Sequence, residues 1–373
     1  MSKKLTKKKS SSLSSYYVVF GVVGALCLYV VVMLFLNQQA PLNKTPVIDD
    51  KRIDEHNRHT PWQQGANKFF EGATLADAKK ILNSSFANHP NLAKCNVDDS
   101  VSPPEFFDAR AQWASCMLPV GNQQRTCGSS YAFVATQATA ERLCIASKDQ
   151  KLTQLSVQEL LSCDTANQGC KGGYINTALD YIKAKGVVDE QCFPYQADSD
   201  TVKCDQVCPN PTVRERIDGY CILFGEEDIK RDIMKNGPVV AATQVHIDFL
   251  TYKSGVYTKG EEVPRFSGFH AVKIIGWGVE AEEGSSRGNK YWLVQNSWGE
   301  DWGQNGVAKI AMGQELMFDS YAYSIKVRSD KPQEPKQEKT AKSTTEGDLS
   351  DLNLDDLELL KDFEEDTTEG KKQ

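Results

Sequence analysis

The sequence has 11 cysteines but no Cys-x-x-Cys pair, and only 5 histidines among its 373 residues. Structural zinc sites usually need closely paired ligands, and Cys204 with Cys208 alone indicates one only weakly. His56 and His59 have a His-x-x-His spacing, which we interpret as chance. We therefore expect no metal and no cofactor. The ten cysteines that follow Cys27 are expected to form disulfides in an oxidising compartment.

A concentrated basic face, a phosphate-binding glycine loop and internal repeats are also absent, so no nucleic-acid partner is expected. The net charge is −7, and the acidic excess is concentrated in residues 329–373, which hold 14 Asp/Glu and 7 Lys/Arg. The polar composition of residues 329–346 predicts a disordered linker. Residues 348–366 are interpreted either as a solvated acidic tail or as a short amphipathic helix that binds a protein partner.

Charged side chains are missing from residues 16–36, which follow a basic segment, residues 1–15, with five lysines. At about 1.5 Å per residue, a helix of this length covers roughly 30 Å, the thickness of a bilayer core. We interpret residues 16–36 as the signal anchor of a single-pass type II membrane protein, with a cytoplasmic N-terminus and a luminal or extracellular domain. A cleaved signal peptide is the alternative. Asn43 and Asn83 begin glycosylation tripeptides and are predicted acceptors on that side.

The hydrophobic pattern changes from helical to strand-like along the main part of the chain. Residues 37–101 are polar and mixed, with one aromatic cluster between Trp62 and Phe70. Helices are predicted over Ser130–Lys148, Gln154–Cys163 and Asn176–Lys185, the last ending at Gly186. Strands are predicted at Pro238–Gln244, His270–Ile275, Tyr291–Gln295 and Val307–Ile310. This order predicts an α+β fold of two packed lobes with a cleft between them.

One stretch, QRTCGSSYAF, has the features of a nucleophile held at the start of a helix, but serine occupies position 130. A thiolate site needs a helix N-terminus, a histidine, a group that orients this histidine, and oxyanion donors. His270 lies 140 residues downstream, and Asn296 follows a predicted strand. The Gln124 amide and the Ser130 N–H are the candidate oxyanion donors. Trp298 is the candidate shield of the His270–Asn296 contact.

These motifs resemble the papain family of cysteine peptidases, and most closely its cathepsin B-like branch, over about residues 55–328. The motifs that carry the resemblance are FDARAQW, QRTCGSSYAF, LLSCDTANQGCKGGY, CFPY, KNGPV, DFLTYKSGVY, HAVKIIGWG and YWLVQNSWGEDWGQNG. The resemblance implies a papain-like fold with a helical left lobe and a β-barrel-like right lobe, formed by residues 102–328. It also implies that residues 37–101, with WQQGANKFF, are a prosegment-like region.

The resemblance assigns roles to individual positions. Ser130 occupies the nucleophile position, Gln124 matches the oxyanion glutamine, His270 the catalytic histidine, and Asn296 the asparagine that holds it. A second set of residues is implied to bind an extended peptide or protein in the cleft or to form disulfides: Gly172 and Gly173 for the peptide backbone, and the pairs Cys116–Cys144, Cys127–Cys170, Cys163–Cys204 and Cys192–Cys208. Cys95 and Cys221 are left without an evident partner.

Four departures from the family pattern surround the candidate site. Serine replaces the nucleophilic cysteine, Arg125 a glycine, Tyr131 a tryptophan, and Phe269 a smaller residue. Residues 171–245 also contain no histidine, so the two-histidine occluding loop of cathepsin B is missing and carboxydipeptidase activity is not expected.

These departures lead to three hypotheses for the function. The leading one is a catalytically impaired peptidase homologue that binds a peptide or protein in its cleft. The second is an active hydrolase that uses Ser130 with His270 and Asn296, and the third is a purely structural protein. Simpler interpretations also stay open: Ser130 as a helix N-cap, His270 and Asn296 as a packing pair, and the two glycines as turn residues.

Overall fold

The computed structural model describes residues 42–89, 92–260, 266, 268–281, 288–314, 316 and 321–328. The chain divides into two units, Met1–Thr45 and Pro46–Gln373. The basic segment 1–15, the apolar run 16–36 and the acidic tail 329–373 all lie outside the described residues.

The prediction of a single-pass type II membrane protein is corrected by the helices of the structure. Within the described ranges, no helix has the length and apolar character needed to cross a bilayer. The apolar run on which that prediction rested lies outside these ranges.

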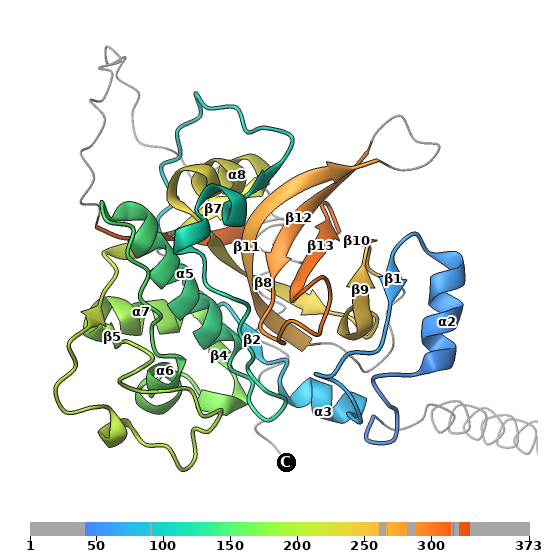
Figure 1. The fold of residues 1–373 in the computed structure, drawn as a ribbon, viewed down its shortest axis with the longest axis horizontal. Helices are drawn as coiled ribbons and strands as arrows, with labels where there is room; N and C mark the ends of the chain where they lie inside the picture. Colours follow the sequence, from blue (N-terminus) through green and yellow to red (C-terminus); the bar gives the residue numbers. More distant parts are fainter. Residues whose placement is uncertain are drawn as a thin grey trace, which may run out of the picture. The chain divides into compact units, whose positions relative to one another are not determined.

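The second unit combines short helices with one large sheet (Figure 1). Its described α-helices are α2 (Asp50–His59), α3 (Leu75–Lys80), α4 (Ala109–Gln112), α5 (Ser130–Ala146), α6 (Val157–Cys163), α7 (Ile175–Lys185) and α8 (Gly225–Asn236). Its described strands are β1 (Gln63–Gln64), β2 (Ser84–Ser85), β3 (Phe107–Asp108), β4 (Gly173–Tyr174), β5 (Val187–Val188), β6 (Arg214–Glu215), β7 (Gly219–Phe224), β8 (Val239–Val245), β9 (Tyr252–Ser254), β10 (Val256–Tyr257), β11 (Gly268–Glu280), β12 (Asn289–Gln295), β13 (Val307–Ala311) and β14 (Tyr321–Lys326).

The main sheet has the strand order β10-β13-β12-β11-β8-β14-β7, and β3 pairs with β11 outside this path. β11 is the long central strand, antiparallel to both β8 and β12. A Cβ atom at Gly276 would lie 2.1 Å from the carbonyl oxygen of Phe107, so glycine at this position permits the close approach of β3.

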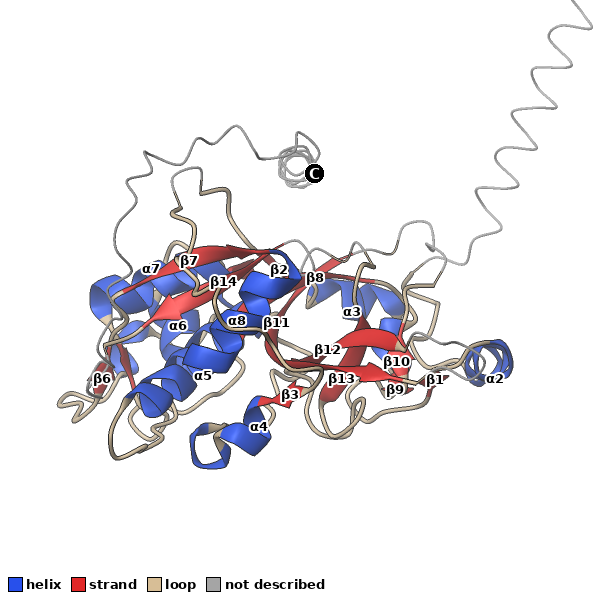
Figure 2. Cartoon of the chain, turned by 90° about the horizontal axis from the view of Figure 1, so that it is seen from above, coloured by secondary structure: helices blue, strands red, loops and turns tan. Residues whose placement is uncertain are grey.

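Helix α5 is buried on nearly all sides because it lies between the other helices and the sheet. It contacts α6 and α7 as well as strands β8 and β11. Alanine recurs along it, and this residue favours helix while it allows close packing. Figures 1 and 2 show α5, α6 and α7 gathered at one end of the sheet and β10, β12 and β13 at the other.

The prediction of an α+β fold is confirmed. The predicted helices correspond to α5, α6 and α7, and the predicted strands to β8, β11, β12 and β13. Helix α7 ends at Gly186, whose φ of 74° is a left-handed conformation that glycine adopts without strain. Strand β11 extends well beyond the predicted His270–Ile275.

The described residues of 46–101, which we call the N-terminal segment, pack against the domain that residues 102–328 form. Helix α2 begins after Asp49, which accepts hydrogen bonds from the N–H groups of Lys51 and Arg52. Helix α3 begins with a reciprocal capping box between Thr74 and Asp77. Two short strands attach the segment to the domain, because β1 pairs with β9 and β2 pairs with β4.

Candidate active site

Ser130 is fully buried at the start of α5. The interpretation of Ser130 as the N-cap is wrong, because Ser129 occupies the N-cap position and Ser130 is the first helical residue. The Ser130 Oγ atom accepts a hydrogen bond from the N–H of Ala271, at 3.3 Å. Ser129 Oγ is 2.7 Å from the hydroxyl of Tyr195. The first turn of α5 is thus held by the residue next to His270 and by the loop that carries Tyr195.

His270 and Asn296 form a buried pair on strand β11 and directly after strand β12. The Nε2 atom of His270 lies 2.7 Å from Asn296 Oδ1, which also accepts from the N–H of Ser297 at 2.7 Å. Since a carbonyl oxygen only accepts, Nε2 of His270 carries a proton, and in the neutral imidazole Nδ1 then carries the lone pair. Nδ1 has no hydrogen-bond partner among the described residues. In its neutral form, this buried imidazole therefore has its basic nitrogen at Nδ1.

Trp298 covers this pair. Its side chain is 1% exposed, and its ring centroid lies 4.6 Å from that of His270. Burial of the imidazole lowers the pKa of His270 to about 4, and the hydrogen bond with Asn296 only partly opposes this change.

The buried imidazole predicts that the protein loses stability on acidification. An unfolded histidine has a pKa of about 6.5. Between this value and the folded pKa of about 4, the unfolded chain binds a proton that the folded chain does not. The free energy of unfolding therefore falls as the pH is lowered through this window, by about 3 kcal/mol from His270.

Urea unfolding of the wild type and of His270→Gln at several pH values checks this prediction. The wild type should lose about 3 kcal/mol more than the variant between pH 7 and pH 4. Parallel pH profiles for the two proteins would contradict the assignment to His270.

The neighbouring residues Gln123 and Gln124 differ in burial. Gln124 is exposed and has a φ of 61°, and its N–H donates to Asn122 Oδ1. Gln123 is fully buried; its Nε2 donates to the carbonyl oxygen of Cys127 at 3.0 Å and its Oε1 accepts from Ser297 Oγ at 2.7 Å. The role of Gln124 as oxyanion donor stays a prediction. Sequence reasoning missed Gln123, which fixes the loop before Ser130.

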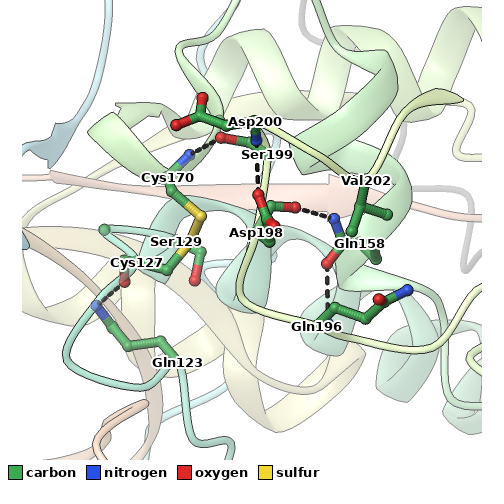
Figure 3. The surroundings of a disulfide bond; sticks show 12 residues. Gln123, Cys127, Ser129, Gln158, Cys170, Gln196, Asp198, Ser199, Asp200 and Val202 are labelled. Atoms are coloured by element: carbon green, nitrogen blue, oxygen red, sulfur yellow. Dashed lines mark hydrogen bonds between the residues drawn. A yellow bond between two sulfur atoms is a disulfide. The ribbon is translucent and has the colours of Figure 1, made fainter.

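A disulfide between Cys127 and Cys170 joins this loop to the segment that carries the two candidate glycines (Figure 3). The N–H of Gly128 donates to the carbonyl oxygen of Cys170 at 2.7 Å. Gly172 has a φ of 114° and follows directly. The disulfide thus holds the loop before Ser130 close to the turn that ends at Gly172.

We call Ser130, Gly172, Gly173, His270 and Asn296 the interlobe site. The N-terminal segment lies against this site at Gly172 and Gly173. Two backbone hydrogen bonds attach the segment here: the N–H of Gly173 donates to Asn83 O at 3.0 Å, and the N–H of Phe269 donates to Leu82 O at 3.3 Å. A Cβ atom at Gly172 would lie 2.1 Å from Asn83 O, so this approach requires glycine. Residues 82–85 therefore lie between the helical part and strand β11.

Aromatic side chains hold the rest of the N-terminal segment against the domain. The ring of Phe69 stacks on Trp298 at 5.7 Å, and Phe70 meets the same ring edge-on at 5.0 Å. Trp62 is 1% exposed and packs edge-on against Tyr257 at 4.9 Å. Buried aromatic contacts of this kind contribute several kcal/mol in total.

Arg125, one of the four departures, binds the same segment. Its guanidinium donates to the carbonyl oxygen of Glu71. The glycine expected from the resemblance has no side chain that reaches this group. Arg125 therefore adds a contact that holds the segment near the site.

The four disulfides implied by the resemblance are all formed: Cys116–Cys144, Cys127–Cys170, Cys163–Cys204 and Cys192–Cys208. Cys95 and Cys221, which the sequence left without partners, form a fifth. Because 126 residues separate the two cysteines, local sequence patterns could not predict this pair.

The two predicted glycosylation acceptors are both exposed. Asn83 donates from Nδ2 to the carbonyl oxygen of Lys171 at 2.8 Å, which places it at the edge of the interlobe site. Glycosylation of Asn43 and Asn83 stays a prediction.

Comparison with known proteins identifies the family. Residues 103–326 match the family described as "Papain family cysteine protease", and the chain belongs to this family. It is 34% identical over 307 residues to a cathepsin B-like cysteine proteinase of Schistosoma japonicum, which covers 72% of this chain and 87% of the relative. It is 36% identical over 264 residues to a gut-specific cysteine proteinase of Caenorhabditis elegans, and the match covers 63% of this chain and 78% of the relative.

Solved structures agree with this assignment. The proCathepsin B S9 of Trypanosoma congolense has a TM-score of 0.68 and 28% identity, covering 76% of this chain and 100% of that one. The digestive procathepsin L2 proteinase of Tenebrio molitor larval midgut has a TM-score of 0.60 and 29% identity, with 74% and 89% covered. The predicted papain-like two-lobe fold and the likeness to cathepsin B-like proteins are confirmed.

Proposed function

We propose that this papain family member is catalytically impaired and acts by binding a peptide or protein segment in the interlobe site. In this proposal Ser130 stands at the nucleophile position. The observation that supports it most directly is the hydrogen bond of Ser130 Oγ, which is made with the backbone of Ala271. His270 Nδ1 has no partner among the described residues, so the pair is not engaged as nucleophile and base.

The chemistry of serine supports the same proposal. A hydroxyl is far less acidic than a thiol of pKa about 8.5, so no serine–imidazolium ion pair forms in advance. Serine proteases stabilise the transient imidazolium with a carboxylate, and replacing that aspartate by asparagine costs about 10⁴ in turnover. Asn296 is uncharged, and the burial that lowers the pKa of His270 also weakens it as a base.

The N-terminal segment is proposed to act as a prosegment that occupies the site in the absence of a ligand. Two observations support this role. Residues 82–85 bind Gly173 and Phe269 through backbone hydrogen bonds, as an extended peptide ligand would. The solved relatives with similar coverage are described as proforms.

A second candidate function is hydrolysis with Ser130 as nucleophile and His270 as base. The lone pair on His270 Nδ1 favours it, because a neutral imidazole is the form that accepts a proton.

For the acidic tail, residues 329–373, we propose a contact with a protein partner. A pulldown that recovers the same partners after deletion of residues 348–366 argues against that contact.

Loosening the N-terminal segment tests the proposed binding. Trp62→Ala removes a buried aromatic anchor of the segment and should weaken its docking by about 3–5 kcal/mol. When the segment docks more weakly, it covers the site less often and added peptide binds more tightly, by up to about 100- to 4,000-fold for this change in docking free energy. Calorimetry with an extended peptide library and the full-length chain measures the change.

Two further variants make the result specific. In the Trp62→Ala background, Gly172→Ala should lower peptide affinity again, since a Cβ atom there meets the backbone of the bound segment. Gly313→Ala is the matched control, because Gly313 also has a positive φ but has no atom within 4 Å of its added Cβ. Turnover of the peptides that is lost in Ser130→Ala, with labelling of Ser130 by a fluorophosphonate, would establish the second candidate instead. An absence of both binding and turnover would show that the site is idle.

A further inference from the structure

The disulfide between Cys95 and Cys221 joins the N-terminal segment to the sheet. Cys95 is 7% exposed and Cys221, on strand β7, is 1% exposed. The backbone on both sides supports the bond, because the Cys95 N–H donates to Ile222 O at 2.8 Å and the Ile222 N–H donates to Ala93 O at 3.1 Å. Residues 93–95 are thus attached to the edge of β7 by hydrogen bonds and by a covalent bond.

The chain that follows Cys95 is open to solvent. Residues 96–102 form no helix or strand, and all of them are exposed except the half-buried Val97. The family match begins directly after this loop, at residue 103. An exposed loop without regular structure is the kind of segment that proteases cut. Hydrolysis here adds one water molecule across one peptide bond and leaves a new carboxylate and a new amine.

The position of Cys95 determines what such a cut achieves. The other four disulfides of the described residues lie entirely between Cys116 and Cys208, so none of them crosses the loop. Cys95 lies on the N-terminal side of the loop, and its partner lies far on the C-terminal side. A cut between Asn96 and Ser102 therefore divides the backbone but not the covalent molecule.

We propose that cleavage in residues 96–102 yields a disulfide-linked two-chain protein whose N-terminal segment still occupies the interlobe site. Ser85 is ten residues from Cys95, a stretch that reaches at most about 30–35 Å. A ligand held by so short a tether has an effective concentration in the millimolar range. The segment therefore rebinds faster than a free peptide at micromolar concentration replaces it.

Release of the segment then requires a second chemical step. A dithiol reductant supplies two electrons and two protons, and Cys95 and Cys221 are left as two thiols while the reductant becomes a disulfide. Opening of the site thus depends on both a hydrolytic and a reductive event. The covalent retention is independent of the proposed peptide binding, whereas the exclusion of peptides rests on it.

Site-specific cleavage of the full-length chain tests the inference. A protease recognition sequence is inserted between Asp98 and Asp99, and the purified protein is cut to completion. On a denaturing gel without reductant, the cut wild type should run as one species of full mass, and with reductant as two fragments. Cys95→Ser/Cys221→Ser should give two fragments under both conditions. Cys192→Ser/Cys208→Ser, which loses a disulfide that does not cross the loop, should behave as the wild type does.

Access to the site is measured with a fluorescent peptide that copies residues 79–89. After the cut, it should bind Cys95→Ser/Cys221→Ser at least about 10-fold more tightly than the wild type.

Two fragments from the cut wild type without reductant would overturn the inference. Equal peptide binding by both cut proteins would overturn the exclusion of ligands by the retained segment. If the peptide binds neither protein, the proposed function fails while the gel still decides covalent retention. If the double variant does not fold, the wild type with and without reductant decides it.

Discussion

Ser130→Cys is expected to gain peptide hydrolysis by at least about 100-fold over the wild type, once the N-terminal segment is displaced. A thiol at the start of α5 loses its proton far more readily than a hydroxyl, because the helix N-terminus and the nearby imidazole both stabilise the thiolate. His270 Nδ1 is the available acceptor for that proton. Fluorogenic peptide amides, assayed in the Trp62→Ala background, measure the gain.

Two controls determine whether the gain comes from the expected chemistry. Ser130→Ala in the same background should be no more active than the serine form. Ser130→Cys/His270→Ala should lose the gained activity and also its labelling by a cysteine-directed epoxide. If Ser130→Cys remains as inactive as Ser130→Ala, the residues around position 130 no longer form catalytic machinery, and the impairment extends beyond the missing sulfur.

The local elements of the fold were predictable because their signals are local. Helix α7 ends at Gly186, and α5 begins within the QRTCGSSYAF motif as expected. The pairing of His270 with Asn296 also followed from motif order, and the structure places the two side chains 2.7 Å apart. Short motifs with a fixed backbone conformation carry such information in few residues.

The remaining features depend on contacts between distant parts of the chain. The buried position of Gln123 is stabilised in part by Ser297, a residue of another loop. The contact of Leu82 and Asn83 with the interlobe site has no sequence signature, because backbone atoms make it and any residue supplies these. The Cys95–Cys221 bond likewise depends on how the N-terminal segment crosses the sheet.

One buried ion pair connects the two elements that carry the site, and removing half of it is expected to destabilise the protein by about 3–5 kcal/mol. Glu141 on α5 accepts from the ammonium group of Lys273 on β11, and both side chains are at most 1% exposed. Glu141 also accepts from the N–H of Leu118 at 3.0 Å. Glu141→Ala leaves the buried ammonium group without its partner, and this desolvated charge is the source of the cost.

Variants of this ion pair distinguish its role in positioning the site from its role in the stability of the protein. Lys273 lies three residues after His270 on β11, and Glu141 lies eleven residues after Ser130 on α5, so the pair fixes the register of the two site elements. Chemical denaturation measures the loss in Glu141→Ala. Glu141→Gln/Lys273→Met, which removes both charges and keeps similar volumes, should recover most of it. In the Ser130→Cys form, this double variant should also retain peptidase activity. Equal destabilisation by the single and double variants would mean that packing, and not the unpaired charge, determines the stability of this contact.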